Sequence, residues 1–296
     1  MKQLYEMVNI TKQAHLSFIN RQELYQQELN IILNAIAGLR IMHPQMGAKK
    51  MYHILKPQSI GRDKFIALAI AEGYGVQKQR NFQRTTFNSH IYKYKNLING
   101  AIIFDINNIW VSDITYFMVE EIYYYLTFIV DLYSRRILGS IAYPTLETKA
   151  NLYALNMAFK IRFIEHYNNL IHHSDRGTQY TSSAYTEALL KKNIRISMCD
   201  SVYENTYVER VNGIIKNEYL QHWTINNFST LKRYLKQAVY LYNNYRPHLA
   251  LNYMTPVSYE NYLKTIPLSE HKSLHLYTTN TLEENNKNIN QLQLFN

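Results

Sequence analysis

The chain has 296 residues, 47% of them hydrophobic and 18% charged, a composition typical of a globular protein large enough for two domains. Cys199 is the one cysteine, which excludes an internal disulfide and a metal–thiolate cluster and favours a reducing, cytosolic setting. The N-terminus lacks the apolar segment of a signal peptide, and the apolar run at 122–130 is too short to cross a bilayer. We therefore expect no contact with a membrane.

The net charge of +10 is concentrated in the first third of the chain. Residues 1–104 hold 14 Lys and Arg against 5 Asp and Glu, whereas residues 105–296 hold 18 against 17. Such an excess of positive charge favours contact with a polyanion such as nucleic acid. The alternative is a basic soluble domain without that role.

A long helix is predicted over residues 21–40. Its apolar side chains recur at helical intervals, namely Leu24, Leu29, Ile32, Leu33 and Ile36. The pair His43-Pro44 is expected to end it, because proline cannot continue a helix.

Two shorter helices are predicted at 49–55 and 63–72, with a turn at 59–61 between them. Two short helices around a glycine turn, in a basic segment, favour a helix-turn-helix-like DNA-binding region over residues 1–80. Helical hairpins that bind no DNA share this pattern. The basic side chains expected to contact DNA are Lys49, Lys50, Arg62 and Lys64.

Residues 81–104 are expected to form a basic linker. From 77 to 100, basic residues are interleaved with aromatic ones without a clear period, as in segments that follow phosphates and stack on bases. A plain solvated linker is the alternative.

Residues 105–265 have the pattern of an α/β domain. Strands rich in aromatic and β-branched residues are predicted at 109–118, 123–132 and 137–143. Helices and short strands then alternate: helix 147–164, strand 170–172, helix 182–192, strand 194–198, and helices 205–219 and 228–245. This order predicts a mixed sheet covered by helices. The polar tail, 266–296, is expected to be partly disordered.

Three acidic residues stand out in this domain. Asp113 lies within an apolar, aromatic strand, where an acid is costly to bury unless it is paired or bound to a metal; the alternative is the solvent face of an edge strand. Asp175 follows a short strand and precedes Arg176-Gly177, so it either caps that turn or holds a ligand. Glu209 projects from a helix on the side opposite its apolar stripe, which is also the position of an ordinary solvated acid.

Taken together, two strand-borne aspartates and a helix glutamate, without Cys or His at ligand spacing, suit a hard cation such as Mg²⁺. Carboxylates of this kind hold two ions roughly 3.5–4 Å apart in enzymes that break phosphodiesters. A basic segment ahead of such a site predicts metal-dependent chemistry on DNA.

Four segments, in chain order, resemble the DDE transposases of bacterial insertion sequences, and specifically the second-reading-frame product of the IS-three family. They are WVSDITYF (110–117), HHSDRGTQYTS (172–182), ENTYVERVNGIIKNEYL (204–220) and YNNYRPHLALNYMTP (242–256). The resemblance covers 105–262 closely. It extends more weakly to 40–80, where HPQMGAKKMYHIL is similar to the helix-turn-helix module that precedes this core.

The resemblance implies a ribonuclease-H-like fold similar to the catalytic core of retroviral integrases. It places the three catalytic and metal-binding acids on Asp113, Asp175 and Glu209. It further implies cleavage and strand transfer at the insertion-sequence ends with two Mg²⁺ ions, which Mn²⁺ can replace. The implied partners are the terminal repeats, target DNA, further copies of the chain and the upstream reading-frame product. The implied location is the bacterial cytoplasm, with the nucleoid.

The chain departs from the family pattern in the interval between the second and third acids. Asp175 and Glu209 are separated by 33 residues, slightly fewer than is typical of the family. Glu204 and Glu218 are therefore rival third acids, although the motif and the helix face favour Glu209. The separate terminal-repeat-binding module that the family usually encodes upstream is not in this sequence.

Further residues near the acids are assigned by the same resemblance. Lys216, Arg176 and Asn212 are candidate DNA contacts. Ser174, Gln179 and Tyr180 are expected to position the second acid. For His172 and His173 the alternatives are hydrogen-bond donors behind the acids and purely structural histidines, and the structural role is favoured. Asp131 is expected to be a structural or turn residue.

The sequence predicts a DDE transposase, and three alternatives are weighed against it. A non-catalytic or domesticated DNA-binding descendant of a transposase is the main one, and the presence of all three acids argues against it. Nuclease activity without strand transfer is not separable by sequence. A tyrosine recombinase using Arg246 and His248 is disfavoured, because these residues belong to the family's C-terminal motif.

Overall fold

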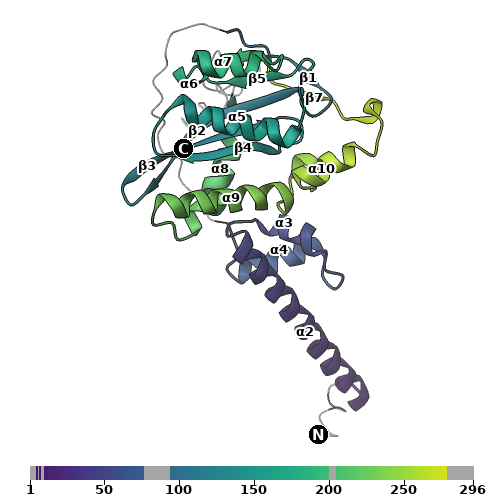
Figure 1. The fold of residues 1–296 in the computed structure, drawn as a ribbon. Helices are drawn as coiled ribbons and strands as arrows, with labels where there is room; N and C mark the ends of the chain where they lie inside the picture. Colours follow the sequence, from purple (N-terminus) through teal and green to yellow (C-terminus); the bar gives the residue numbers. More distant parts are fainter. Residues whose placement is uncertain (1–4, 6, 8–9, 77–93, 200–204, 279–296) are drawn as a thin grey trace, which may run out of the picture. The chain divides into compact units, whose positions relative to one another are not determined.

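The computed structural model describes residues 5, 7, 10–76, 94–199 and 205–278. These fall into two compact units, Met1–Lys78 and Gln79–Asn296 (Figure 1). The part of the predicted linker up to residue 93 lies outside the described residues.

The first unit consists of three helices, α2 (Lys12–Met42), α3 (Ala48–Leu55) and α4 (Arg62–Ala71). Helix α2 begins nine residues before the predicted start, where the Thr11 hydroxyl accepts a hydrogen bond from the Ala14 amide and caps the helix. It ends before His43-Pro44, as predicted.

The core of the first unit lies between the C-terminal half of α2 and the two short helices. Its buried apolar residues are Ile32, Ile36, Leu39, Met46, Ala48, Met51, Ile60, Phe65 and Ala69. The expectation that Leu24 belongs to this apolar face is wrong, because its side chain is 61% exposed. Residues of α2 before Leu29 contribute nothing to this core.

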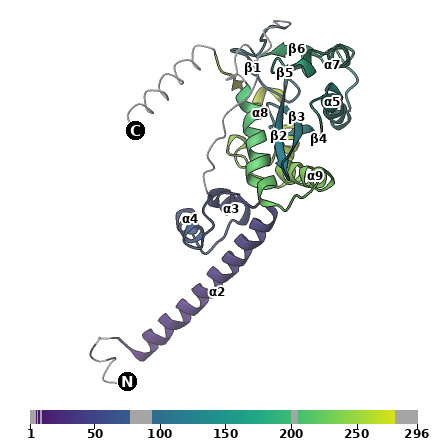
Figure 2. The same ribbon diagram turned by 90° about the vertical axis from the view of Figure 1, so that its left-hand side faces the viewer.

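The second unit is built on a mixed five-stranded sheet with the strand order β4-β3-β2-β5-β6 (Figure 2). Strands β2, β3 and β4 pair antiparallel, and β5 and β6 add to β2 in parallel. The bounds are β2 Ile109–Val119, β3 Ile122–Asp131, β4 Ile137–Tyr143, β5 Ile171–Ser174 and β6 Arg195–Met198. The predicted α/β class and its mixed sheet are confirmed.

Helices cover both faces of this sheet and bury a separate core on each. The helices of the second unit are α5 Thr148–Arg162, α6 Thr178–Thr181, α7 Ser183–Leu190, α8 Thr206–Ile214, α9 Phe228–Asn244 and α10 Pro256–Leu263. One core joins the sheet to α8 and α9, and the other joins it to α5, α6 and α7. Along β2, Val111 enters the first core and Trp110 the second, as strand alternation requires. Helix α5 lies so close to β4 that a Cβ on Gly139 would stand 2.1 Å from the Ala154 carbonyl oxygen.

The helix predicted at 205–219 changes type along its length. It is α-helical over Thr206–Ile214 and π-helical over Ile215–Tyr219, followed by a 3₁₀ turn at Leu220–His222. The prediction of a regular helix to residue 219 is therefore wrong for its last five residues. Wider π turns of this kind are frequent at functional sites, because they redirect the side chains they contain.

The chain after Pro267 differs from the expected tail in the part that is described, up to residue 278. Strand β7 (Leu274–His275) pairs antiparallel with β1 (Ile102–Ile103). Leu276 is buried in the core beneath α8 and α9. This segment is therefore a packed part of the second unit.

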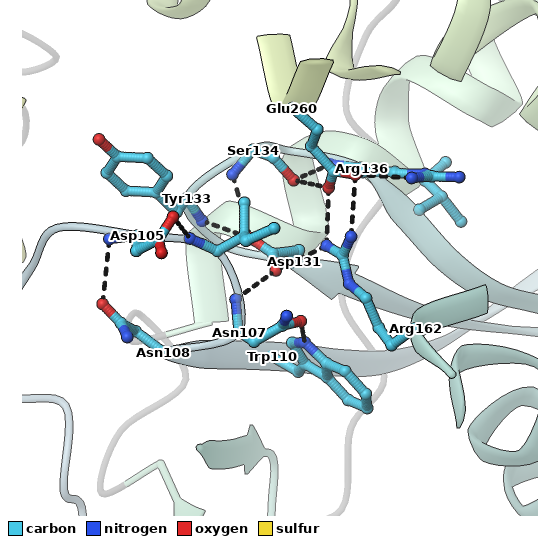
Figure 3. A network of polar contacts seen from close by, with 12 residues as sticks. Asp105, Asn107, Asn108, Trp110, Asp131, Tyr133, Ser134, Arg136, Arg162 and Glu260 are labelled. Carbon is cyan, nitrogen blue, oxygen red and sulfur yellow. Dashed lines mark hydrogen bonds and ion pairs between the residues drawn. The ribbon is translucent and has the colours of Figure 1, made fainter. Parts of the chain in front are cut away.

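A buried ion-pair network fastens α10 to the sheet (Figure 3). Arg162, from the end of α5, donates to Glu260 of α10 and to Asp131 at the end of β3, at 2.6–2.9 Å. Asp131 also accepts the amides of Asn107, Tyr133 and Ser134. The structural role expected for Asp131 is confirmed. None of the described helices is long and apolar enough to cross a membrane.

Candidate active site

Asp113 lies on the central strand of the sheet. Strand β2 runs between β3 and β5 up to Ser112, and Asp113 lies beneath α8, whose Asn212 donates to it, so the alternative of an acid on the solvent face of an edge strand is wrong. The side chain is half-buried on the face that α8 covers, and its pKa is raised well above the ordinary value. Burial is the largest cause, and the charges of Asp175 and Glu209 add to it. The three predicted acids are thus close enough to interact electrostatically.

Asp175 follows the last residue of β5. Its Oδ1 accepts the Gly177 amide at 3.0 Å, which closes the Asp-Arg-Gly turn. Burial raises the pKa of Asp175, and this bond opposes the rise. A Cβ on Gly177 would stand 2.9 Å from Gln179 Oε1 and 3.1 Å from Asp175 Oδ1, so a larger residue there would require both side chains to shift. The turn-capping interpretation is therefore confirmed for Oδ1.

Glu209 lies in the first turn of α8, half-buried, while Val208, Val211 and Ile215 face the core as predicted. The rival Glu218 accepts two bonds from the buried guanidinium of Arg246, at 2.6 and 2.7 Å. The other rival, Glu204, lies outside the described residues. Among the described residues, the carboxylates do not converge tightly enough to form a ready three-ligand metal site.

Asn212 and Lys216, both expected to contact DNA, make contacts beside Asp113. The Asn212 amide nitrogen donates to Asp113 Oδ2 at 2.7 Å, and its side chain is almost fully buried. Lys216 Nζ donates to Thr115 Oγ1 at 3.1 Å and lies 5.1 Å from the centre of the Tyr116 ring. Burial lowers the pKa of Lys216, and the charge of Asp113 opposes that shift. The spacing Glu209-x-x-Asn212-x-x-x-Lys216 on one helix face is the sequence signal for this grouping.

Residues around the Asp175 turn hold it against the sheet. The Ser174 hydroxyl donates to the Asp175 carbonyl at 3.0 Å. The Tyr180 and Ser112 hydroxyls lie 2.9 Å apart, which joins α6 to β2 one residue before Asp113. Gln179 bonds to the Leu146 carbonyl, and Arg176 is half-buried within the turn.

The two histidines before Asp175 are fully buried. His172 Nε2 lies 3.0 Å from the Tyr185 hydroxyl, and His173 lies 2.8 Å from Ser197 Oγ and 3.1 Å from Cys199 Sγ. Burial lowers the pKa of each histidine to about 3, so both are neutral at physiological pH. Their contacts are structural, as expected.

The basic residues predicted to contact DNA in the first unit lie on α3 and α4. Lys49 and Lys50 are in the first turn of α3, and Arg62 and Lys64 are in the first turn of α4. Burial lowers the pKa of His53, and the charges of Lys49, Arg62 and Lys56 lower it further. The two helices therefore bring Lys49 and Arg62 into one positively charged region.

Comparison with known proteins identifies the family of the chain. Two sequence profiles, each described as an integrase core domain, match residues 106–203 and 193–256. An insertion element IS600 protein of Shigella sonnei is 30% identical over 208 residues, which cover 68% of this chain and 75% of that protein. The transposase InsF of the insertion sequence IS3A of Escherichia coli K12 is 27% identical over 81% of this chain and 84% of its own length.

Other matches are shorter or more distant. A putative transposase of IS986/IS6110 from Mycobacterium tuberculosis is 37% identical over 120 residues, which cover 39% of this chain and 43% of that protein. The catalytic core domain of HTLV-2 integrase, solved with magnesium, superposes with a TM-score of 0.42 and 22% identity over 52% of this chain and 97% of its own. None of these relatives favours the non-catalytic alternative. The chain belongs to the IS3 family of insertion-sequence DDE transposases, enzymes of DNA transposition and integration with an integrase-type core.

Proposed function

We propose that Asp113, Asp175 and Glu209 are the catalytic acids of this transposase and that they bind two divalent cations, Mg²⁺ or Mn²⁺. The observation that carries the proposal is that three half-buried carboxylates lie near one another, so that the charges of Asp175 and Glu209 add to the rise in the pKa of Asp113. Like charges in a partly desolvated place are unfavourable without a cation, and an all-oxygen donor set suits hard divalent ions. When bound, such ions supply an activated oxygen nucleophile and stabilise the leaving oxygen.

The chain's own residues prepare this site. Asn212 orients Asp113 by its bond to Oδ2, and the Gly177 amide fixes one oxygen of Asp175. Glu209 approaches from α8. The engagement of Glu218 by Arg246 supports Glu209 as the third acid.

The reaction proposed for this site has two steps. Water attacks a phosphodiester at the transposon end, and the bond to the 3′ oxygen breaks, which leaves a 3′-hydroxyl and a 5′-phosphate. That hydroxyl then attacks a phosphodiester of the target, joins the two strands and displaces the target's 3′ oxygen. Lys216 and Arg176 contact the DNA near the acids, while Lys49, Lys50, Arg62 and Lys64 hold it through the first unit. Several copies of the chain, with or without the upstream reading-frame product, act on paired ends.

Strand transfer on a labelled duplex carrying the element's own ends tests the proposal. Wild type is compared with Asp175→Asn, Glu209→Gln and Glu218→Gln, in Mg²⁺ or Mn²⁺, with and without the upstream reading frame fused. Joined product from wild type and Glu218→Gln, but not from the other two variants, is expected. Product that survives Asp175→Asn would contradict the metal–carboxylate mechanism, and product lost only with Glu218→Gln would move the third acid to Glu218.

A calorimetric titration of Mn²⁺ gives a second readout without DNA. Wild type and folded Glu218→Gln should bind the ion alike, and Asp175→Asn should bind it more weakly. Equal affinity in all three would exclude Asp175 as a ligand.

A further inference from the structure

One face of the β2–β3 hairpin leads away from the proposed catalytic acids and carries exposed aromatic side chains. Strand β5 pairs with β2 only as far as Ser112, opposite Ser174. From Asp113 onward, the described strands pair with β2 on its β3 side alone. The edge of β2 that begins at Asp113 is thus the edge beside which Asp175 lies.

Side chains that alternate along the hairpin form this face. Tyr116 and Met118 of β2 stand opposite Tyr125 and Tyr123 of β3. The rings of Tyr116 and Tyr123 meet edge to face, with centroids 5.4 Å apart. Tyr116, Met118 and Tyr123 are 41%, 55% and 53% exposed, whereas Phe117 and Tyr124, on the opposite face, pack against the core under α8 and α9. We call Tyr116, Met118 and Tyr123 the hairpin platform.

A cation lies between the platform and the acids. Lys216 Nζ is bonded to Thr115 and lies 5.1 Å from the Tyr116 ring centre. The charge of Asp113, which is three residues from Tyr116 on the same strand, acts on Lys216 and opposes the lowering of its pKa by burial. Because the separation is odd, the side chains of Asp113 and Tyr116 point to opposite faces of β2, and a DNA strand that reaches both must cross the edge of β2 that β5 leaves unpaired. At 3.3 Å per residue the separation along the strand is about 10 Å, or about three steps of a DNA strand at 3.4 Å each.

We propose that the hairpin platform stacks an unpaired nucleobase within the first three nucleotides of the DNA end held at Asp113 and Asp175. This inference rests on the proposed function and adds the base-binding subsite beside it. Aromatic faces next to a cationic side chain are the combination that binds unpaired bases without sequence preference. Lys216 then neutralises a phosphate of the same nucleotide.

The acidic hairpin turn limits the ligand to a short DNA end. Glu120 and Glu121, both with φ in the left-handed region, form the turn at the far end of the platform and are exposed. Their charges repel a phosphate backbone that continues past the platform. We therefore expect the platform to bind a duplex end that is opened over a few nucleotides, and not the body of a duplex.

A cycle of protein and DNA changes tests the proposal. End duplexes carry an abasic site at each of the first three nucleotides in turn, and affinity is measured by fluorescence anisotropy beside strand transfer with a pre-cleaved end. Stacking of one base is worth about 1–3 kcal/mol, so wild type should lose about 5- to 150-fold in affinity with one of the abasic duplexes. Tyr116→Leu should lose the same factor on intact DNA and nothing further on the abasic duplex, while Tyr116→Phe keeps the wild-type preference.

Tyr153→Leu is the matched control. Tyr153 is 43% exposed on α5 and has Lys149 Nζ 5.9 Å from its ring centre, so it reproduces the lysine–tyrosine pair away from the acids. This variant should discriminate the abasic duplex as wild type does. Tyr123→Leu should behave like Tyr116→Leu.

The proposal would be overturned if Tyr116→Leu and the abasic site each lowered the affinity independently, so that the variant lost a further factor on the abasic duplex. A platform that instead covers another copy of the chain would show as weakened self-association of Tyr116→Leu in sedimentation without DNA, together with independent losses of this kind. The affinity measurement does not require the protein to cleave or join DNA. It therefore tests the base-binding inference even if wild type shows no strand transfer and the proposed function fails.

Discussion

The Asn212 side chain is the contact through which α8 orients Asp113. Its amide donates to Asp113 Oδ2 at 2.7 Å from an almost fully buried position. Groups that orient a metal-binding carboxylate typically contribute about 10- to 100-fold in metal affinity or activity. We therefore expect Asn212→Ala to lower Mn²⁺ affinity and strand transfer by that factor and to leave the affinity for DNA near the wild-type value.

Asn217→Ala is the control for this prediction, because Asn217 lies on the same helical segment and its recorded contact uses the backbone carbonyl, which accepts from His222. It should bind Mn²⁺ as wild type does. Weaker DNA binding by Asn212→Ala with unchanged Mn²⁺ affinity would instead support the sequence-based role of Asn212 as a DNA contact.

The raised pKa of Asp113 has a consequence for stability without metal. A carboxyl whose pKa is higher in the folded state opposes folding when it is ionised, and this penalty disappears as the pH falls through the raised pKa towards the ordinary value. In EDTA at pH 8, Asp113→Asn should therefore melt at a higher temperature than wild type, and the gap should narrow at pH 5. Each kcal/mol of relief is worth about 2–4 °C in a unit of this size.

Saturating Mg²⁺ should reverse that order, because a bound ion stabilises only the protein that holds it. Thermal unfolding monitored by circular dichroism, with and without the ion, measures both effects. A melting temperature of Asp113→Asn below that of wild type in EDTA would show that the ionised carboxylate is compensated within the protein itself.

At the scale of elements, the ion-pair network makes α10 part of the catalytic unit. Burial alone raises the pKa of Glu260, but its bonds to Arg162 and Ser134 and the charge of Arg136 outweigh burial and hold this pKa below the ordinary value of 4.5. The side chains of Glu260 and Arg162 are 4% and 6% exposed. Removing one partner of such a buried pair leaves an uncompensated charge and costs about 3–5 kcal/mol.

Glu260→Gln should therefore lower the free energy of unfolding at pH 7 by about 3–5 kcal/mol. Because the folded-state pKa is depressed, the contribution of Glu260 is complete above pH 4.5 and is lost as the pH falls through the lower folded value. The gap between variant and wild type should thus close in acid. Urea unfolding at pH 7 and pH 3.5 measures it, with the exposed Glu270→Gln as control. A gap that is constant with pH would mean that lost packing, not charge, is responsible.

The elements that were predicted correctly are those whose formation depends on the pattern of their own residues. Elements that depend on contacts with distant segments were missed. Strands β2 and β4 and helix α9 follow from alternation and apolar periodicity, so their predicted bounds lie within a residue of those observed. The π turn at Ile215–Tyr219 has no periodic signature, and its Glu218 is fixed by Arg246 from a distant segment. Strand β7 is too short and polar to stand out in sequence, and it exists because β1 offers it a partner.

The same distinction applies to the candidate site: its residues could be predicted from local sequence, whereas the contacts between them could not. The three acids were found from residue type and motif, because an acid within an apolar strand or beside a tight turn is visible in sequence. The Asn212–Asp113 bond and the position of Lys216 over Tyr116 were not predicted, because each joins α8 or its π extension to β2 about a hundred residues away. The helix face could be read from periodicity, but the partner of that face could not.

For the whole molecule, the charge distribution and the two units suggest separate contributions to binding and to chemistry. The excess positive charge lies in residues 1–104, and Lys49 is exposed and Lys50 half-buried on α3 of the first unit. The proposed catalytic acids all lie in the second unit. If the first unit contributes mainly phosphate contacts, its loss of charge should weaken DNA binding and reduce the dependence of that binding on salt.

The combined change Lys49→Ala and Lys50→Ala tests this division in the full chain. The slope of log affinity against log salt should become shallower by about 0.9 for each phosphate contact removed, and strand transfer should recover when the protein is saturating. Asp175→Asn should show the reverse, an unchanged slope with no product. The control is the double variant Lys191→Ala and Lys236→Ala. It removes the same charge from two exposed positions of the second unit, at the end of α7 and on α9, and should change the slope less. An equal change from both lysine pairs would mean that the second unit shares the phosphate contacts, and that the charge of the first unit is not specific to DNA binding.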